Sequence, residues 1–135
     1  MIELKSPYII YLPKIVDVRG NLTCLEGSLI PFEIKRVYWV YDVPGGGRRE
    51  GHAFLKQHEF VVALSGSFDV VVYNGKKEKG YHLNRAYFGL YLPNGLWRHI
   101  ENFSTNSVAM VLSSSGFDES DYIRDYGNYQ YYITK

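Results

Sequence analysis

The stretch that decides the fold runs from Gly46 to Gly66 and reads GGRREGHAFLKQHEFVVALSG. Its notable residues are spaced as Gly46, five residues, His52, one residue, Phe54, four residues, Glu59, six residues and Gly66. Side chains two apart on a strand point to the same face, so His52 and Phe54 share one face. We expect this face to line the interior of a β-structure.

A second stretch, from Pro93 to Asn102, reads PNGLWRHIEN. Together the two stretches resemble the paired motifs of the cupins, small β-barrels whose metal-binding members gather three histidines and one glutamate. Phe54 and Arg98 stand at two of those histidine positions, so only His52 and Glu59 remain. A phenylalanine ring has no lone pair, and an arginine side chain stays protonated, so neither ligates a metal. We predict a site with no metal and no cofactor.

The composition favours one all-β domain over residues 1–135. The 13 tyrosines and 7 phenylalanines favour strands, and the 13 glycines serve turns and bulges. Short β-type runs between turn residues predict strands at 8–12, 22–26, 34–41, 59–64, 68–73, 79–83, 89–92, 97–102 and 108–113. The predicted fold is a small cupin jelly-roll barrel with a short helix at 118–126. The aromatic tail at 126–133 should pack on the barrel or on a partner subunit.

Charge and cysteine content narrow the possible partners and setting. A formal net charge of +1 does not indicate binding to nucleic acid or to an acidic membrane surface. Cys24 is the only cysteine, so an intrachain disulfide is impossible and a reducing compartment is favoured. Residues 1–14 lack the pattern of a signal peptide, and no apolar run reaches membrane-spanning length. We expect a cytoplasmic protein that binds neither nucleic acid nor membranes.

His52 is the leading candidate for a general base or acid, because an imidazole titrates near neutrality. The alternative is an inert histidine that only makes structural hydrogen bonds. Arg36 and Tyr38 lie two apart on one face of the strand 34–41, where they would be costly without polar partners. Arg36 could bind phosphate and Tyr38 could donate a proton or hydrogen bond. A half-exposed strand with a solvated Arg36 is equally consistent with the pattern.

Three further basic residues are candidates for contact with a ligand. Arg98 could pair with a phosphate, with a developing enolate oxygen, or with the carboxylate of Glu59 in a buried structural pair. Arg19, next to the turn at Gly20, could present its guanidinium to a phosphate or form a salt bridge with Asp17. Lys56 shares the face of His52 if the strand continues that far.

Several segments together resemble one family of sugar nucleotide-modifying cupins, the dTDP-4-keto-6-deoxyglucose 3,4-ketoisomerases. The matching segments are 17–22, 30–38, 52–53, 64–67, 89–91 and 121–124. The resemblance implies a homodimer, a metal-free active site and a dTDP-linked 4-keto-6-deoxyhexose as substrate. It also implies that His52 is the catalytic base, with Tyr38 and Arg36 nearby. Where the family carries His-Ala-His, this chain has His52-Ala53-Phe54. Where the family carries Trp-His, this chain has Trp97-Arg98.

Such an isomerase removes the C3 proton, forms an enediolate and protonates C4, giving a 3-keto sugar nucleotide. A transaminase can then install the 3-amino group of 3-amino-3,6-dideoxy sugars, as used in O-antigen or other surface polysaccharides. Two other functions remain open, a 3,5-epimerase of the same substrates and a non-catalytic sugar-nucleotide-binding cupin. The predicted site consists of the catalytic residues His52 and Tyr38 and the substrate-binding residues Arg19, Arg36, Phe54, Lys56, Glu59 and Arg98.

Overall fold

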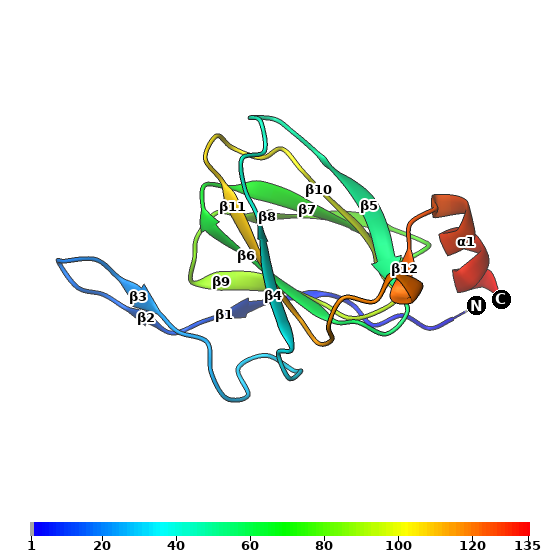
Figure 1. Ribbon diagram of the computed structural model, residues 1–135, viewed down its shortest axis with the longest axis horizontal. Coiled ribbons are helices and arrows are strands. Elements are labelled where there is room, and N and C mark those ends of the chain that lie inside the picture. The colour runs from blue at the N-terminus through cyan, green and yellow to red at the C-terminus, as the bar shows by residue number, and fades with distance from the viewer. Residues whose placement is uncertain (1) are drawn as a thin grey trace.

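Two antiparallel sheets stacked face to face form the body of the protein, in a computed structural model that describes residues 2–135 (Figure 1). The first sheet has the strand order β1-β9-β6-β11-β4, and the second has the order β12-β5-β10-β7-β8. The first sheet comprises β1 (Tyr8–Tyr11), β4 (Arg36–Val40), β6 (Glu59–Ser65), β9 (Phe88–Leu92) and β11 (Val108–Ser113). The second comprises β5 (Arg49–Phe54), β7 (Phe68–Tyr73), β8 (Glu78–Leu83), β10 (Trp97–Glu101) and β12 (Tyr122–Ile123).

The main core lies between these sheets and follows the alternation of side chains along the strands. In β7, Phe68, Val70 and Val72 are buried while the residues between them are half-buried. Opposite them, the first sheet contributes aliphatic side chains. The buried members of this cluster are Val61, Ala63, Phe68, Val70, Val72, Leu83, Leu90, Leu92, Leu96, Phe103, Ala109 and Val111. The sequence-based expectation of an all-β fold is therefore confirmed.

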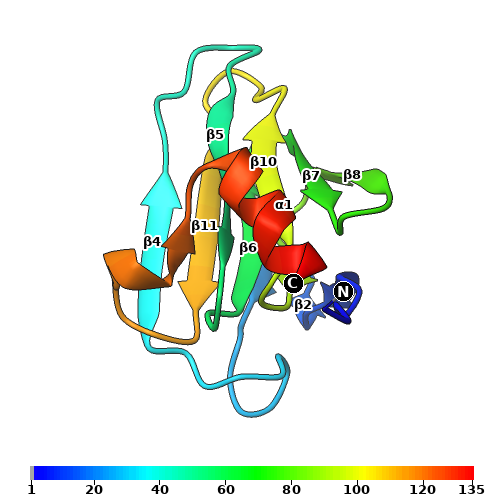
Figure 2. The same ribbon diagram turned by 90° about the vertical axis from the view of Figure 1, so that its right-hand side faces the viewer.

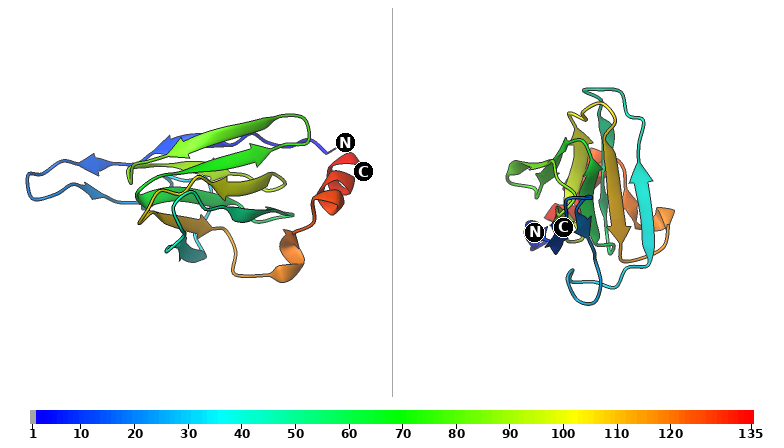
Figure 3. Two further views of the ribbon diagram at one scale, coloured as in Figure 1. Left: turned by 90° about the horizontal axis from the view of Figure 1, so that it is seen from above. Right: turned by 90° about the vertical axis from the view of Figure 1, so that its left-hand side faces the viewer.

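A small hairpin extends away from the two sheets at one end of the molecule (Figures 1 and 3). It is made of β2 (Lys14–Ile15) and β3 (Leu22–Thr23), which pair only with each other. The strand expected at 22–26 is thus shorter than predicted. The apolar side chains of this hairpin are not packed against any other part of residues 2–135. The exposed members are Ile15, Val16, Val18 and Leu22.

The C-terminal segment corrects one sequence-based prediction. The helix expected at 118–126 is wrong: this stretch holds the short 3-10 helix η1 (Glu119–Asp121) and strand β12. The α-helix is α1 (Tyr126–Thr134), which begins after Asp125 accepts a hydrogen bond from the backbone N–H of Asn128. Gly127 lies inside the first turn of this helix, because the cap at Asp125 starts the helix at Tyr126.

Helix α1 lies across one end of the barrel, against the outer face of β5 (Figure 2). Tyr129 and Ile133 are buried there against Ala53, and the Tyr129 hydroxyl donates to the carbonyl of Gly95 at 2.8 Å. The aromatic tail therefore packs on the barrel, one of the two outcomes expected from the sequence. No helix among residues 2–135 is long and apolar enough to cross a membrane.

Candidate active site

A pocket of about 270 Å³ lies between the two sheets and is lined by four of the residues singled out in the sequence: His52, Tyr38, Glu59 and Arg98. The first sheet lines it with Tyr38, Val40, Glu59, Val61, Leu92 and Val111. The second sheet and the turn after β12 line it with Arg49, Glu50, His52, Val70, Arg98, His99, Ile100, Tyr122 and Arg124. The pocket thus has an aliphatic wall carrying two polar groups and a facing wall rich in titratable groups.

Glu59 is the centre of a buried hydrogen-bond network at the base of this pocket. Its side chain is 3% exposed and accepts four hydrogen bonds from side chains. The donors are Arg98 Nη1 at 2.7 Å, the Tyr38 hydroxyl at 2.7 Å, Gln57 Nε2 at 2.9 Å and Ser113 Oγ at 3.2 Å. A buried carboxylate needs this degree of pairing to offset the loss of hydration. Glu59 is therefore held in one place, with three donors on Oε2 and one on Oε1.

Arg98 is held from two sides and keeps one nitrogen free. Its Nη1 pairs with Glu59, its Nε donates to the carbonyl of Leu96 at 3.2 Å, and its guanidinium carbon lies 5.1 Å from the centre of the Phe54 ring. Its Nη2 is buried and has no hydrogen-bond partner among residues 2–135. The pairing with Glu59 that the sequence left open is confirmed. The free nitrogen remains available for an anionic or electron-rich oxygen.

His52 directs an unpaired nitrogen into the same pocket. Its Nε2 is buried without a hydrogen-bond partner among the described residues. Burial, followed by the charge of Arg98, lowers the pKa of His52 to about 3, while a hydrogen bond with the backbone of Glu50 works in the opposite direction. The imidazole is consequently neutral at physiological pH. A neutral imidazole with a free nitrogen is able to accept a proton.

Tyr38 faces His52 from the other sheet. Burial and the neighbouring Glu59 carboxylate raise the pKa of Tyr38, because both disfavour a phenolate. Its proton is already donated to Glu59. The phenol oxygen therefore presents lone pairs, and not a hydrogen, to any ligand in the pocket.

A local irregularity places His52 opposite Arg98. The pairing between β5 and β10 matches His52 with Arg98 and Arg49 with Ile100, so β5 contains one extra residue between these pairs. Gly51 lies in this bulge, where a Cβ atom would come within 2.6 Å of the Trp97 indole nitrogen. A glycine is needed here because Trp97 covers the outer surface of the bulge.

Tyr122 and Asp121 complete the site, and the sequence reasoning gave neither a role. The Tyr122 ring packs 5.5 Å from His52 and 4.5 Å from Phe54. The Asp121 carboxylate accepts from the backbone N–H groups of Lys56 at 2.8 Å and Gln57 at 3.0 Å, which ties β12 to the turn after β5. Both residues belong to the segment 121–124 that carried the family resemblance, and this was the available signal. Gln57 was recognisable from its position two residues before Glu59.

Two predicted substrate-binding residues lie beside the pocket without lining it. Phe54 is fully buried and supports His52 and Arg98. Arg36 stacks on Tyr38, with its guanidinium carbon 4.9 Å from the ring centre, and its Nε and Nη2 are buried and unpaired among residues 2–135. Direct contact of either residue with substrate remains a prediction.

Lys56 and Arg19 lie away from this pocket. Strand β5 ends at Phe54, so Lys56 falls in an exposed turn and does not continue the inward face. Arg19 lies on the projecting hairpin and forms a salt bridge of 2.9 Å with Asp17, the more ordinary of the two outcomes considered. Its side chain is 86% exposed.

The donor set gives a metal ion little to bind. No group of three or more His, Cys, Asp or Glu side chains converges anywhere in residues 2–135. Of the cupin ligand positions, Glu59 already accepts four hydrogen bonds, and the Arg98 guanidinium lies beside it. A fixed cation and a neutral imidazole in one small pocket instead suit proton transfer next to a carbonyl group.

Comparison with known proteins places the chain in a family. Residues 5–134 match the family model described as FdtA: WxcM-like, C-terminal. A TDP-4-oxo-6-deoxy-alpha-D-glucose-3,4-oxoisomerase from Aneurinibacillus thermoaerophilus is 40% identical over 128 residues, which cover 94% of this chain and 92% of that protein.

The solved structures most similar in fold include further 3,4-ketoisomerases. A 3,4-ketoisomerase from Helicobacter canadensis is 34% identical, with a TM-score of 0.93 over 96% of this chain and 98% of that one. The sugar 3,4-ketoisomerase QdtA from Thermoanaerobacterium thermosaccharolyticum, crystallised with TDP, is 36% identical, with a TM-score of 0.92 over 97% and 96% of the two chains. A mutant of that enzyme was crystallised with TDP-4-keto-6-deoxyglucose.

The fold extends to more distant proteins. The RmlC epimerase of Mycobacterium tuberculosis is 18% identical, with a TM-score of 0.77 over 92% of this chain and 70% of that one, and shares the fold alone. This likeness confirms the predicted RmlC-like cupin barrel. On the evidence of the family match and the curated relative, the chain belongs to the FdtA family of WxcM-like, C-terminal proteins.

Proposed function

We propose that this protein is a sugar-nucleotide 3,4-ketoisomerase that converts a dTDP-linked 4-keto-6-deoxyhexose into its 3-keto isomer. The observation that carries the proposal is the pair of unpaired nitrogens, His52 Nε2 and Arg98 Nη2, buried in one pocket. One is a neutral base and the other belongs to a fixed cation. Relatives of 34–40% identity with this activity support the same reading.

The two nitrogens perform complementary parts of the reaction. His52 Nε2 takes the proton from C3, and the electrons of that bond form the C3–C4 double bond of an enediolate. Negative charge develops on O4, where Arg98 Nη2 can donate a hydrogen bond. Such a fixed donor stabilises an oxyanion by an amount worth roughly 10²–10³ in rate. Protonation of C4 and transfer of the O3 proton to O4 then give the 3-keto product.

The size of the pocket indicates which part of the substrate enters. Its volume of about 270 Å³ lies just below the roughly 300–1,000 Å³ of pockets that enclose a whole drug-sized ligand. We assign this space to the hexose and place the nucleotide at the rim. Arg49 and Arg124 lie at that rim, where their charges favour a diphosphate.

The proposal includes independence from metal ions and a cytoplasmic setting. The Arg98 guanidinium supplies the positive charge that a metal would otherwise bring to the enediolate, and it is held by Glu59. The single cysteine, Cys24, needs no oxidising compartment. The 3-keto product is suited to a transaminase that forms a 3-amino sugar, which places this step before an amination.

Incubation with dTDP-4-keto-6-deoxyglucose in heavy water, followed by proton NMR, tests the proposed function. We expect a 3-keto product with solvent exchange confined to C3 and C4. Exchange at C3 and C5 without movement of the carbonyl would identify an epimerase. Binding of dTDP without any turnover would identify a non-catalytic module. Full activity after treatment with a chelator, with no stoichiometric metal in the purified protein, is expected as well.

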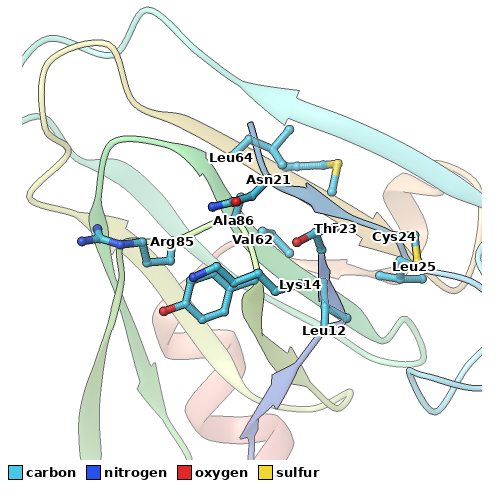
Figure 4. A pocket seen from close by; sticks show the side chains of 12 residues that line it. Leu12, Lys14, Asn21, Thr23, Cys24, Leu25, Val62, Leu64, Arg85 and Ala86 are labelled. Atoms are coloured by element: carbon cyan, nitrogen blue, oxygen red, sulfur yellow. The ribbon is translucent and has the colours of Figure 1, made fainter. Parts of the chain in front are cut away.

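We also propose that the protein is a homodimer, because two apolar surfaces are exposed on the single chain. The hairpin exposes Val16 and Val18 at 73% and 105%, and the outer face of the first sheet exposes Trp39 and Tyr41 at 57% and 62%. A cavity of about 500 Å³ lies between the hairpin and that sheet, lined by both (Figure 4). Strand β4 is an edge strand of the first sheet. Docking of a second copy would cover these groups.

In a homodimer, Arg19 could contact the substrate bound to the second copy. The hairpin carries Arg19 away from its own pocket, so contact with substrate requires the pocket of a second copy. Light scattering on the purified protein checks the oligomeric state, with Val18→Asp as the disrupting variant. A monomer in the unchanged protein at micromolar concentration would refute the dimer.

A further inference from the structure

We propose that the outer face of the second sheet carries a second ligand site, a pocket that binds a small organic ammonium ion. The pocket has a volume of about 560 Å³ and is lined by strands of that face and by the first residues of helix α1. Its aromatic side chains come from β7, β10 and α1, and they are Tyr73, Trp97 and Tyr126. The proposal does not depend on the reaction assigned to the pocket between the two sheets.

The sheet itself separates this site from the pocket between the two sheets. Side chains alternate along β10, so Trp97 and His99 point to the outer face, whereas Arg98 points to the inner one. His99 is hydrogen-bonded at 2.6 Å to Glu101, two residues along the same face. Of the two pockets, Trp97 lines the outer one and Arg98 the inner one, and three residues border both: Glu50, His99 and Arg124. A ligand beside Trp97 therefore lies outside the space that the two sheets enclose.

Three aromatic rings that pack on one another form the apolar part of the site. The Trp97 ring centre lies 5.2 Å from that of Tyr126, with the ring planes 77° apart, and Tyr126 lies 5.8 Å from Tyr73. Gly51 lets the indole lie close to β5, because a Cβ atom there would approach the indole nitrogen to 2.6 Å. Trp97 and Tyr73 are half-buried, and Tyr126 is 40% exposed. Ring faces attract cations, tryptophan most strongly, so this wall suits an alkylated ammonium group.

Three carboxylates stand beside these rings. Glu50, Glu78 and Asp125 line the pocket, and none of them forms a salt bridge among residues 2–135. Burial, the hydroxyl of Tyr73 and the charge of Glu78 all raise the pKa of Tyr126. The Tyr126 phenol is therefore uncharged, and it lies close enough to Glu78 for the two to interact. A cation in this position meets ring faces and carboxylates together.

The positive charges around the pocket are already balanced. Arg48 pairs with Glu101 at 3.7 Å, and Arg124 pairs with Glu119 at 2.6 Å. Neither of these two carboxylates lines the pocket. The lysines on either side of Glu78 in the sequence line a different cavity. The charge that remains within the pocket is negative, which favours a positively charged ligand.

The lining favours an organic cation over a metal ion. No group of three or more His, Cys, Asp or Glu side chains converges in residues 2–135, so the carboxylates of the pocket do not form a coordination site. Ring faces, by contrast, hold an ammonium group without ligating it. The volume of about 560 Å³ lies within the roughly 300–1,000 Å³ of pockets for small molecules. The site therefore fits one small molecule that carries an ammonium group.

Choline, a quaternary ammonium ion, is the probe that tests the site. It is titrated into the isotope-labelled full-length protein while NMR follows the indole N–H groups of Trp97 and Trp39, the two tryptophans of the chain. Trp39 is 57% exposed on the first sheet and serves as the internal control, and Trp39→Phe assigns the two signals. We expect a saturable shift at Trp97 alone. No shift at Trp97, or equal shifts at both indoles, would overturn the proposal.

A neutral analogue separates charge from apolar contact. In 3,3-dimethylbutan-1-ol, a carbon atom replaces the nitrogen of choline and the shape is retained. This alcohol should bind at least about fivefold more weakly than choline, because exposed cation–π contacts contribute roughly 2- to 5-fold each. Equal affinities would leave only an apolar groove and refute the assignment to a cation.

Two substitutions locate the bound probe. Glu78→Gln and Tyr126→Leu should each weaken choline binding by about 2- to 5-fold. Glu26→Gln is the matched control, since Glu26 is an exposed carboxylate after β3, and it should leave the affinity unchanged. Affinities equal to that of the unchanged protein in both pocket variants would place choline elsewhere and refute the site.

Saturating dTDP distinguishes this site from the proposed active site. The Trp97 shift should persist in its presence, because the nucleotide belongs to the rim of the other pocket. Competition by dTDP would assign the outer pocket to the substrate and refute a separate site. Binding of choline is measured without turnover, so a lack of ketoisomerase activity would refute the proposed function alone.

Discussion

Arg98 and Arg19 each hold a carboxylate at hydrogen-bond distance, but they do so in opposite surroundings. Arg98 Nη1 lies 2.7 Å from Glu59, and both side chains are 3% exposed. Arg19 Nη2 lies 2.9 Å from Asp17, with side-chain exposures of 86% and 37%. The barrel pocket and the hairpin thus contain the same ion pair at nearly the same distance. The pairs differ most in how much water reaches them.

This difference separates a fixed pair from a replaceable one. In the pocket, neither charge can turn to water if its partner is lost, so the pair holds both residues in one geometry. On the hairpin, solvent competes for both groups, and Arg19 is free to exchange Asp17 for another anion. The pocket is therefore built before substrate arrives, whereas the hairpin is open to a partner that the single chain does not contain.

The largest expected effect is on turnover, through His52→Asn in the pocket. We expect the rate to fall by at least about 10²–10⁴, the usual contribution of a general base. Binding of dTDP should stay within a few-fold, because the imidazole contacts the sugar. His82→Asn is the matched control, since His82 is half-exposed and pairs with Asp69 outside the pocket. Steady-state kinetics and calorimetry provide the measurements, and unchanged turnover in His52→Asn would remove this residue from the mechanism.

The next effect is on stability, through Arg98→Met. This change leaves the Glu59 carboxylate buried without its cation, although Tyr38, Gln57 and Ser113 still donate to it. Loss of one partner of a buried pair typically costs about 3–5 kcal/mol. Urea unfolding measures the difference. A loss of less than about 1 kcal/mol would mean that the three remaining donors hold Glu59 without the cation.

A smaller effect is expected on acidification. The pKa of His52 is lowered to about 3 in the folded protein, against an ordinary value near 6.5. Between these two pH values the unfolded chain binds a proton that the folded chain does not, so stability falls as the pH drops below about 6.5. At pH 5 the loss amounts to about 2 kcal/mol.

Two measurements check this pH dependence. The unfolding free energy of the unchanged protein should fall more between pH 7 and pH 5 than that of His52→Asn. In parallel, kcat/KM should show no acid limb near pH 6.5, because the base stays neutral well below that value. If kcat/KM of the unchanged protein falls at pH 6–7, and the same fall is seen in the variants that keep His52, the pKa of His52 lies at its ordinary value.

The sequence singled out four residues that line the pocket but not the rest of its wall. The spacing of His52 and Glu59, with Arg98 in the second motif, predicted residues that the fold brings together, because it matches the paired motifs of the cupins. The network around Glu59 was only partly visible. Ser113 lies 54 residues away in the chain, and a contact at that separation leaves no local pattern.

Local propensity failed where tertiary packing decided the structure. The segment 118–126 has a good capping residue in Asp118, yet it forms only a short 3-10 turn before joining the sheet as β12. Asp121 uses its carboxylate to hold the turn after β5, which draws Tyr122 into the pocket. The Lys56 prediction failed for the same reason, because this turn ends β5 at Phe54.

The smallest effect is expected from Arg19→Met, the matched substitution on the hairpin. Because solvent already competes for Arg19 and Asp17, the urea midpoint of this variant should equal that of the unchanged protein. Its KM for the sugar nucleotide should nevertheless rise if the hairpin places Arg19 at the pocket of a second copy. Equal KM values within twofold would remove Arg19 from substrate binding. A lowered midpoint would instead show that water does not weaken the hairpin pair, and the contrast with Arg98 would then depend on something other than burial.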